Sequence, residues 1–429
     1  MSNYTQSTNF ATKDALSPGD PLKIVRGTEI NTEFTNIAVA VATKLDTTGL
    51  ASPGPIGATT PSSFNGTTGT FSGAVSGTTG TFSGNVQMAS LNGGQLAGLR
   101  NKIINGNMGI FQRGTTAVTT TNVYGPADRW ENDGIGDTFS TSQGAFVSGD
   151  TLYDTGGAQF YTQIAVTSVA GANNYYKLQQ PIEDVRILAG QTVTVSFWAK
   201  AASGTPSIAL ELYQFFGTGG SPSAAVPGIG QAQALTTTWT KYSKTFAIPS
   251  LAGITLGTTA NTSYTVLGFW IDAGTSFSGV GGRAAGIGTQ VSKTVSIAQV
   301  QLEVGPVATP FEQRPIGMEL ALCQRYFETI RYQTSSVISV CQATSTTAAS
   351  GFGTNFAVTK ISTPALTYGT GSANALTATG SNAGGTILAS APSVNNFNWS
   401  VTSASGLVAG NAVIINCAST LILQASAEL

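Results

Sequence analysis

The residues best suited to ligand chemistry lie on three predicted strands. Trp198, Tyr213 and Trp270 each fall on the mixed face of their strand, with Glu211 and Asp272 beside them. Aromatic rings can stack on the apolar side of a pyranose, while carboxylates and amides bind its hydroxyl groups. If the strands are neighbours, this face can bind a glycan. The alternative is that these rings fill a second hydrophobic layer or a subunit interface, because large aromatic side chains are often mostly buried.

Two further tryptophans are candidate ligand contacts. Trp239 and Trp399 lie in segments flanked by predicted loops. By contrast, the segment containing Arg129 and Trp130 is expected to be structural. We predict that this arginine is tied to a carboxylate or to backbone carbonyls, and that Trp130 lies in the core.

Any catalysis would depend on carboxylates, because the sequence contains no histidine. This excludes a Ser-His-Asp triad, a Cys-His pair and an HExxH zinc site. Glycoside hydrolysis needs two carboxyl groups about 5–9.5 Å apart. The acids to examine first are Glu183, Asp184, Glu211 and Asp272. Glu183 and Asp184 are adjacent, and adjacent strand residues point to opposite faces. We expect no enzymatic activity.

A metal site is the weaker interpretation of the acidic cluster Glu131, Asp133 and Asp137. Calcium prefers oxygen ligands, but the spacing lacks an EF-hand pattern. A solvated acidic loop is therefore favoured over structural Ca²⁺, and no cofactor is expected. The cysteines are widely spaced and odd in number, which favours buried free thiols; they are Cys323, Cys341 and Cys417.

Charge is scarce and unevenly distributed. Only 9 % of the 429 residues are charged and the net charge is −1, against about 25 % charged in ordinary soluble domains. Residues 47–99 carry no charge, and beyond Arg331 only Lys360 and Glu428 are charged. These shifts predict four segments: a head at 1–46, a connector at 47–99, a middle domain at 100–316 and a C-terminal domain at 317–429.

Several partner classes are excluded by these features. A near-neutral chain lacks the basic surface of a nucleic-acid binder. No apolar run approaches the roughly 18–20 residues of a membrane span, so no membrane insertion is expected. The first 25 residues lack the basic start and apolar core of a signal peptide.

One helix is predicted in the head, beginning near Gly27 after an irregular segment. Its apolar residues are spaced 4, 3, 4 and 4, which is close to a coiled-coil seam. Association with copies of the same chain would bury this seam; the alternative is packing on the chain's own domain. The seam residues are Ile30, Phe34, Ile37, Val41 and Leu45.

The connector contains a direct repeat of period 11, GTTGTFSG, that places Phe71 and Phe82 at equivalent positions. Two such units cannot bury two phenylalanines within one chain, whereas several intertwined chains can point them at a shared axis. We therefore predict an intertwined β stalk rather than a flexible linker.

The remainder is predicted to be mainly β. Alternation over Thr192–Lys200, Ile208–Tyr213 and Thr265–Asp272, with turn-rich connections, favours a jelly-roll β-sandwich in the middle domain. A short helical run at Met318–Glu328 follows. The weakly charged segment Tyr332–Leu429 is predicted to be a smaller β domain at the tip.

Several motifs resemble the tail-fibre proteins of short-tailed bacteriophages. The opening at Asn3–Phe34 resembles their virion-attachment segment, and the GTTGTFSG repeat resembles their shaft repeats. Four stretches resemble the carbohydrate-binding jelly rolls of phage tail proteins: NKIINGNMGIFQRGT (Asn101–Thr115), ADRW (Ala127–Trp130), VTVSFWAK (Val193–Lys200) and VQLEVGPVATPFEQRP (Val300–Pro315). ELALCQRYFE (Glu319–Glu328) commonly follows that module.

The resemblance implies a homotrimeric virion fibre assembled in the host cytoplasm. Residues 1–46 would attach it to phage tail or adaptor proteins, and its β domains would bind host surface polysaccharide. Phage depolymerases are usually long β-helices, for which this chain has neither room nor pattern. The expectation is a non-enzymatic adhesin; the alternatives are a structural fibre or collar component without glycan binding, and a polysaccharide depolymerase.

Overall fold

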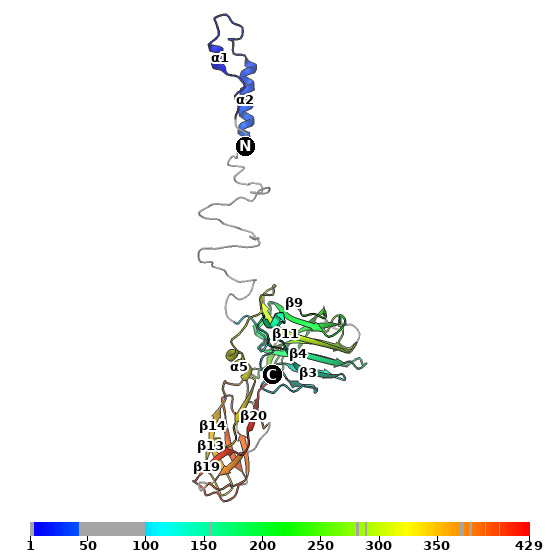
Figure 1. Ribbon diagram of the computed structural model, residues 1–429, viewed down its shortest axis with the longest axis vertical. Helices are drawn as coiled ribbons and strands as arrows, with labels where there is room; N and C mark the ends of the chain where they lie inside the picture. Colours follow the sequence, from blue (N-terminus) through cyan, green and yellow to red (C-terminus); the bar gives the residue numbers. More distant parts are fainter. Residues whose placement is uncertain are drawn as a thin grey trace. The chain divides into compact units, whose positions relative to one another are not determined.

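The structure is a computed structural model of the whole chain (Figure 1). It divides into two compact units, Met1–Asn85 and Val86–Leu429, which are described separately. Phe71 and Phe82 of the predicted stalk lie outside the described residues. Those residues are 4–42 and 99–429, except 155, 280–282, 288–289, 369–372, 377–379, 391 and 403.

The first unit contains the predicted helix, α2 (Gly27–Ala42), and a short α1 (Phe10–Asp14) within the segment expected to be irregular. Glu33 of α2 anchors the preceding chain. It accepts hydrogen bonds from Ser7 N at 2.8 Å, from Ser7 Oγ at 2.6 Å and also from Tyr4 and Thr8. The N-terminal segment therefore packs on the polar face of α2.

The apolar seam of α2 is open within the single chain. Ile30, Phe34, Ile37 and Val41 are 41 %, 66 %, 40 % and 60 % exposed. In contrast, Glu33 and Ala40 are buried by the chain's own residues. In the described residues, therefore, the seam does not pack on its own domain, which was the alternative.

The middle domain is a two-sheet sandwich of antiparallel strands. One sheet has six strands in the order β1 (Val123–Tyr124), β2 (Glu131–Ile135), β5 (Tyr175–Glu183), β10 (Ser263–Ala273), β7 (Ser207–Phe216) and β8 (Val226–Ala234). The other has five strands in the order β3 (Thr138–Ala145), β4 (Phe160–Thr167), β11 (Lys293–Val304), β6 (Thr192–Ala201) and β9 (Thr240–Ala247). Short helices α4 (Thr151–Asp154) and η1 (Val185–Ile187) interrupt the connections.

The core lies between the two sheets and follows the predicted alternation. Leu267, Phe269 and Ile271 of β10 are fully buried in it, while the intervening residues point to the outer face. Phe197 of β6 packs edge-to-face on Phe269, with ring centroids 5.1 Å apart. The three strands predicted from the sequence are confirmed as β6, β7 and β10, and the chain is a mainly β protein.

Helix α5 (Ile316–Gln324) and a smaller β domain complete the chain. The helical run ends earlier than predicted, because Phe327–Tyr332 pairs with the last strand as β12. The domain contains a three-stranded sheet, β12 (Phe327–Tyr332), β20 (Leu421–Ser426) and β15 (Ala365–Tyr368). Its six-stranded sheet has the order β16 (Ala373–Leu376), β19 (Ala412–Cys417), β13 (Val337–Ala343), β14 (Ala349–Asn355), β18 (Asn396–Thr402) and β17 (Thr386–Ser390).

Both charges beyond Arg331 lie where this domain joins the sandwich. Lys360 donates to Glu328 at 2.5 Å and is fully buried as a side chain. Glu428 pairs with Arg129 and, at 2.9 Å, with Arg113. The prediction that Arg129 is tied to a carboxylate is therefore confirmed.

The predicted burial of two other residue types is also confirmed. Trp130 is fully buried in the sandwich core. The three cysteines are free and buried, as expected: Cys323, Cys341 and Cys417. Among the helices of the described ranges, none has the length and apolar character to cross a membrane.

Candidate glycan-binding faces

Strands β7 and β10 are neighbours, and this brings Glu211, Tyr213 and Trp270 onto one outer face. In the antiparallel register Glu211 lies opposite Gly268, and Tyr213 lies opposite Val266. All three side chains point away from the core of the sandwich, on the six-stranded sheet. The strand pairing therefore places these three residues on a shared face, as the sequence predicted, and their contact with a ligand stays a prediction.

Trp270 and Glu211 form the buried centre of that face. The indole Nε1 donates to Glu211 Oε2 at 2.6 Å, and the two residues are 1 % and 2 % exposed. Arg283 pairs with the other oxygen of Glu211 at 2.9 Å. Its guanidinium also lies 5.4 Å from the ring centroid of Tyr213.

Trp270 does not present a free ring. Tyr175 and Phe277 pack on it, with ring centroids 5.2 Å and 5.6 Å away, and Ala284 and Ile287 complete the cover. These last three residues come from the connection between β10 and β11, which folds back over the sheet. A ligand on this face would therefore meet Tyr213 and its polar neighbours rather than Trp270.

The half-buried polar groups of the face come from β2 and β5. Gln179 donates to Glu131 at 2.8 Å, and Lys177 pairs with Asp133 at 3.1 Å. Tyr175 also donates to Asp133, at 2.8 Å. Burial raises the pKa of Glu131 above its ordinary value, while the Gln179 contact opposes that shift.

The sequence interpretation did not include Lys177, Gln179 or Arg283. Two of them were detectable in principle, because Lys177 and Gln179 follow Tyr175 at alternate positions of β5, on the side opposite Leu178. Arg283 was not detectable, since it reaches the sheet from a Gly- and Ala-rich connection.

Trp198 lies on the opposite side of the sandwich. Its strand, β6, belongs to the five-stranded sheet, so the expected grouping with Tyr213 and Trp270 is wrong. It packs in an outer cluster with Trp239, Phe146 and Tyr161. Trp239 lies 5.0 Å from Phe146 and 5.3 Å from Tyr161 between ring centroids. Both tryptophans are half-buried, and this cluster is a second aromatic surface.

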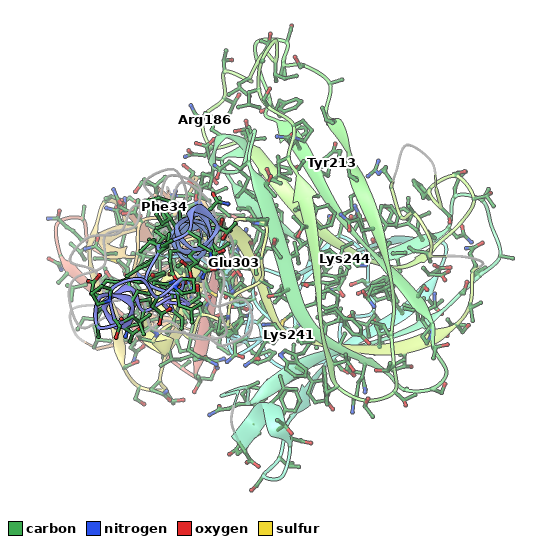
Figure 2. All side chains as sticks on the ribbon, turned by 90° about the horizontal axis from the view of Figure 1, so that it is seen from above. Phe34, Arg186, Tyr213, Lys241, Lys244 and Glu303 are labelled. Carbon is green, nitrogen blue, oxygen red and sulfur yellow. The ribbon has the colours of Figure 1, made fainter. Side chains whose placement is uncertain are left out.

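Tyr213 of β7 and Lys241 of β9, one from each sheet, are labelled in Figure 2. Lys241 is paired in register with Trp198. Lys200 lies 5.2 Å from the ring centroid of Trp239. The outer face of the five-stranded sheet thus brings Lys200 and Lys241 beside the aromatic cluster of Trp198 and Trp239.

Asp272 is fully buried at the end of β10, away from any open surface. It accepts from Ser168 at 2.6 Å and from Lys293 at 3.2 Å, and it adjoins Asp137. Burial raises the pKa of Asp137 to about 6, and the negative charge of Asp272 adds to this. A ligand-contact role for Asp272 is not supported by this position.

Trp399 is a core residue of the C-terminal domain. It is fully buried against Phe397 and Tyr332, and its indole donates to Thr354 at 3.0 Å. No ring face is open to a sugar, so its proposed ligand contact is wrong for the single chain.

The remaining carboxylates considered for catalysis have cationic partners. Glu183 pairs with Arg325 at 2.5 Å and accepts from Tyr326 at 2.8 Å. Asp184 pairs with Arg186 at 2.8 Å. Burial raises the pKa of Glu183, but hydrogen bonds from Arg325 and Tyr326 outweigh it, so that this pKa is lowered. A hydrogen bond from Arg186 lowers the pKa of Asp184 against the effect of burial.

The acidic cluster considered for calcium is divided in the structure. Glu131 and Asp133 share a strand face and are held by Gln179 and Lys177, whereas Asp137 adjoins Asp272. Within the described ranges, no group of three or more acidic, histidine or cysteine side chains is arranged to hold a metal.

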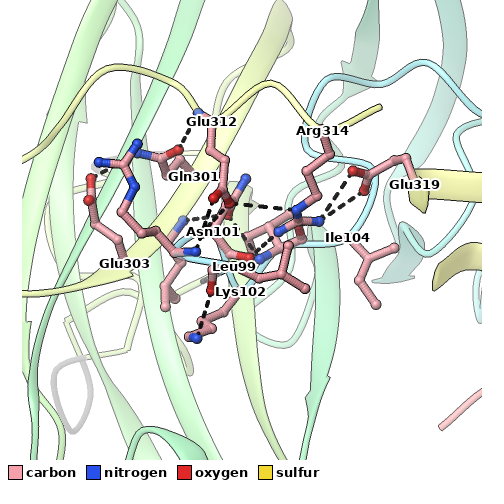
Figure 3. A network of polar contacts seen from close by, with 12 residues as sticks. Leu99, Asn101, Lys102, Ile104, Gln301, Glu303, Glu312, Arg314 and Glu319 are labelled. Carbon is pink, nitrogen blue, oxygen red and sulfur yellow. Dashed lines mark hydrogen bonds and ion pairs between the residues drawn. The ribbon is translucent and has the colours of Figure 1, made fainter. Parts of the chain in front are cut away.

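The segments that precede the first strand and follow the last strand of the sandwich, near Asn101 and Glu312, are joined by a network of polar contacts (Figure 3). Glu312 accepts from Asn101 N at 2.9 Å. Arg314 donates to the carbonyl oxygen of Ile103 at 3.1 Å and pairs with Glu319 at 3.2 Å. Gly106 allows close approach, since a Cβ there would lie 2.1 Å from Val300 O. These motifs therefore hold the beginning and the end of the sandwich domain together.

Residues 137–260 match the sequence profile of the CBM4/9 carbohydrate-binding domain family. The chain thus contains a carbohydrate-binding module with a β-sandwich fold. A search of curated proteins found no match.

Solved structures with distant similarity include three of different origin. The enzymatically active domain of tailspike protein 4 from bacteriophage CBA120 is 14 % identical, with 48 % of this chain and 21 % of that chain covered and a TM-score of 0.28. A family 11 carbohydrate-binding module from Clostridium thermocellum, in complex with a mixed-linked β-tetrasaccharide, is 12 % identical. The match covers 46 % of this chain and 99 % of that chain, with a TM-score of 0.26. A xylan-binding domain from Paenibacillus barcinonensis is 11 % identical. The match covers 46 % of this chain and 99 % of that chain, with a TM-score of 0.24.

Proposed function

We propose that this protein is a bacteriophage fibre adhesin that binds host surface polysaccharide without cleaving it. The observation that carries the proposal is the outer face of the six-stranded sheet within the carbohydrate-binding module. There Tyr213 shares the face with a connected set of hydrogen-bonding groups on β2 and β5 that includes Gln179 and Lys177. Such a face offers both a ring for stacking and donors and acceptors for hydroxyl groups.

The proposal that the protein does not cleave its ligand is supported by the partners of the acidic residues. Glu211, Asp272 and Glu183 are each ion-paired to arginine or lysine. A catalytic carboxyl group must reach its substrate, and Glu211 and Asp272 are almost fully buried.

Self-association of the chain, as a homotrimer, is the third element of the proposal. The open seam of α2 supports it, because four apolar residues at coiled-coil spacing are 40–66 % exposed. Several weak sugar-binding sites on one particle would together bind the polysaccharide more tightly than one site, because each further site binds at a high effective concentration. Residues 1–46 would attach the fibre to phage tail or adaptor proteins, and the virion would be its location.

The test is size-exclusion chromatography of bacterial surface polysaccharide after incubation with the full-length protein, following protein and sugar together. Sugar of unchanged length that co-elutes with protein is the expected result. Shortened sugar would contradict the non-enzymatic proposal. Intact sugar that never co-elutes, across polysaccharides from a panel of hosts, would favour a structural fibre or collar role instead.

A further inference from the structure

Two further half-buried aromatic residues lie next to Tyr213 on the outer face of the six-stranded sheet. Phe215 follows Tyr213 by two positions on β7, and the alternating burial of this part of the strand places both rings on that face. Tyr264 of β10 lies opposite Phe215 in the antiparallel register. The rings of Phe215 and Tyr264 have centroids 4.9 Å apart and are tilted by 30°. They therefore form an aromatic pair beside Tyr213.

This aromatic pair is not part of a hydrophobic core. Among the described residues, neither ring belongs to the core between the sheets or to the cluster that covers Trp270. Val266 lies opposite Tyr213 and two positions from Tyr264 on the same face, and it is only 7 % exposed. The three rings therefore surround a buried aliphatic side chain, while each ring remains half-buried and keeps part of its own surface open.

The hydroxyl groups of Tyr213 and Tyr264 are available to a ligand. Within the described residues neither hydroxyl group has a hydrogen-bond partner, and neither oxygen is fully buried. Tyr175 on the same face differs, because its hydroxyl group donates to Asp133 at 2.8 Å. Burial raises the pKa of Tyr213 and of Tyr264 above the ordinary value of 10.0, so both hydroxyl groups keep their proton at neutral pH and can donate.

The arginines nearby are already paired with carboxylates of the same chain. Arg283 pairs with Glu211 at 2.9 Å. Arg325 pairs at 2.5 Å with Glu183, which lies opposite Tyr264 on β5. A carboxylate or phosphate group of a ligand would have to compete with these acids for the arginines, whereas an uncharged sugar would leave both pairs intact. The charge pattern therefore favours an uncharged ligand.

We propose that Phe215 and Tyr264 form a second sugar-binding position, next to Tyr213, for an uncharged pyranose. This inference deepens the proposed function and rests on it. Tyr213 and Phe215 are two residues apart on one strand, which separates them by about 7 Å. Neighbouring units of one polysaccharide chain stack on the two rings. Phe215 contacts the C–H groups of its sugar, and the hydroxyl group of Tyr264 forms a hydrogen bond with the same unit.

The test is calorimetric titration of full-length variants with the bacterial polysaccharide that co-elutes with the unmodified protein. Phe215→Leu removes the ring but keeps an apolar side chain, and it should weaken binding about tenfold. Tyr264→Phe removes only the hydroxyl group and should weaken binding about fivefold. Tyr161→Phe is the matched control, because Tyr161 is half-buried in the outer cluster of the other sheet. Circular dichroism checks that all three variants are folded.

Weaker binding by both variants, with an affinity that changes little between low and high salt, supports the inference. Binding that either variant leaves unchanged would overturn it, as would equal weakening by Tyr161→Phe. The proposed function would stand in both cases, because the unmodified protein still binds the polysaccharide. An affinity that falls steeply with salt would overturn the assignment to an uncharged sugar. If no polysaccharide co-elutes with the unmodified protein, the proposed function and this inference fail together.

Discussion

The indole nitrogen of Trp270 donates to a Glu211 oxygen at 2.6 Å beneath the residues that cover the six-stranded sheet. Both side chains point outward from the sandwich core, yet both are almost fully buried. The pair therefore stabilises the sheet and its covering connection, and it orients Arg283 beside Tyr213. In the proposed function, ligand contacts on this face would depend on the pair without including it.

Replacing Trp270 with phenylalanine should lower the free energy of unfolding by about 1–3 kcal/mol, because Glu211 loses a buried donor. Urea denaturation followed by tryptophan fluorescence measures this change. Tyr213→Phe is the matched control on the same face and should stay within about 0.5 kcal/mol of the unmodified protein. Equal stability of Trp270→Phe and the control would argue against a structural pair.

Replacing Glu428 with alanine should destabilise the joint between the sandwich and the C-terminal domain. Arg129 is fully buried and would lose its carboxylate, which typically costs about 3–5 kcal/mol. Thermal unfolding is the measurement, and Arg186→Ala is the control because its pair with Asp184 is exposed. A melting temperature lowered equally by both changes would contradict the assigned role of Glu428.

The strands themselves followed from local alternation. In TVTVSFWAK the period of two separates Val193, Val195 and Phe197 from the outward side, and β6 has that arrangement. The same reasoning placed Tyr213 and Trp270 on outward positions. Such patterns depend on neighbouring residues in the sequence, which is why they could be predicted.

The grouping of strands into sheets could not be predicted in the same way. Trp198 and Trp270 occupy equivalent outward positions, but β6 pairs with β11 whereas β10 pairs with β5 and β7. These pairings join residues far apart in the chain. The cover over Trp270 was equally hidden, because Phe277 and Arg283 sit in a Gly- and Ala-rich connection with no periodic pattern.

The Asp137–Asp272 pair should make stability depend on pH. The folded pKa of Asp137 is about 6 against an ordinary value of 3.8, so between these values the folded protein holds a proton that the unfolded chain has released. Stability from this group is therefore lost as the pH rises from about 4 to about 6. Asp137→Asn mimics the protonated form and should lose less stability than the unmodified protein between about pH 4.5 and pH 7. The midpoints of urea denaturation of both proteins at the two pH values test this prediction. An identical loss of stability in the variant and the unmodified protein would contradict it.

Glu33→Gln should loosen the N-terminal segment from α2. Hydrogen bonds from Ser7 and Tyr4 lower the pKa of Glu33 to about 2. Its stabilising contribution is therefore present above its ordinary value of 4.5 and is lost only as the pH falls towards 2. At neutral pH the variant should be cut faster by trypsin after Lys13, whereas Thr32→Ala on the exposed side should be cut at the original rate. Unchanged cleavage of Glu33→Gln would show that the segment is held by other contacts.

The final prediction maps glycan binding onto one face of the sandwich. Tyr213→Ala and Gln179→Ala should each weaken binding to a polysaccharide identified by co-elution by about tenfold, the equivalent of about 1.4 kcal/mol. Both residues are only partly buried, so the fold should be retained, and circular dichroism checks this.

Lys241→Ala is the matched control for that series because Lys241 is exposed on the five-stranded sheet, beside Trp198. Calorimetric titration of the three variants distinguishes the two faces. If Lys241→Ala weakens binding while Tyr213→Ala does not, the aromatic cluster of Trp198 and Trp239 is the binding face. In that outcome the cationic surface, rather than the connected carboxylate and amide groups of β2 and β5, would determine which polysaccharide is bound.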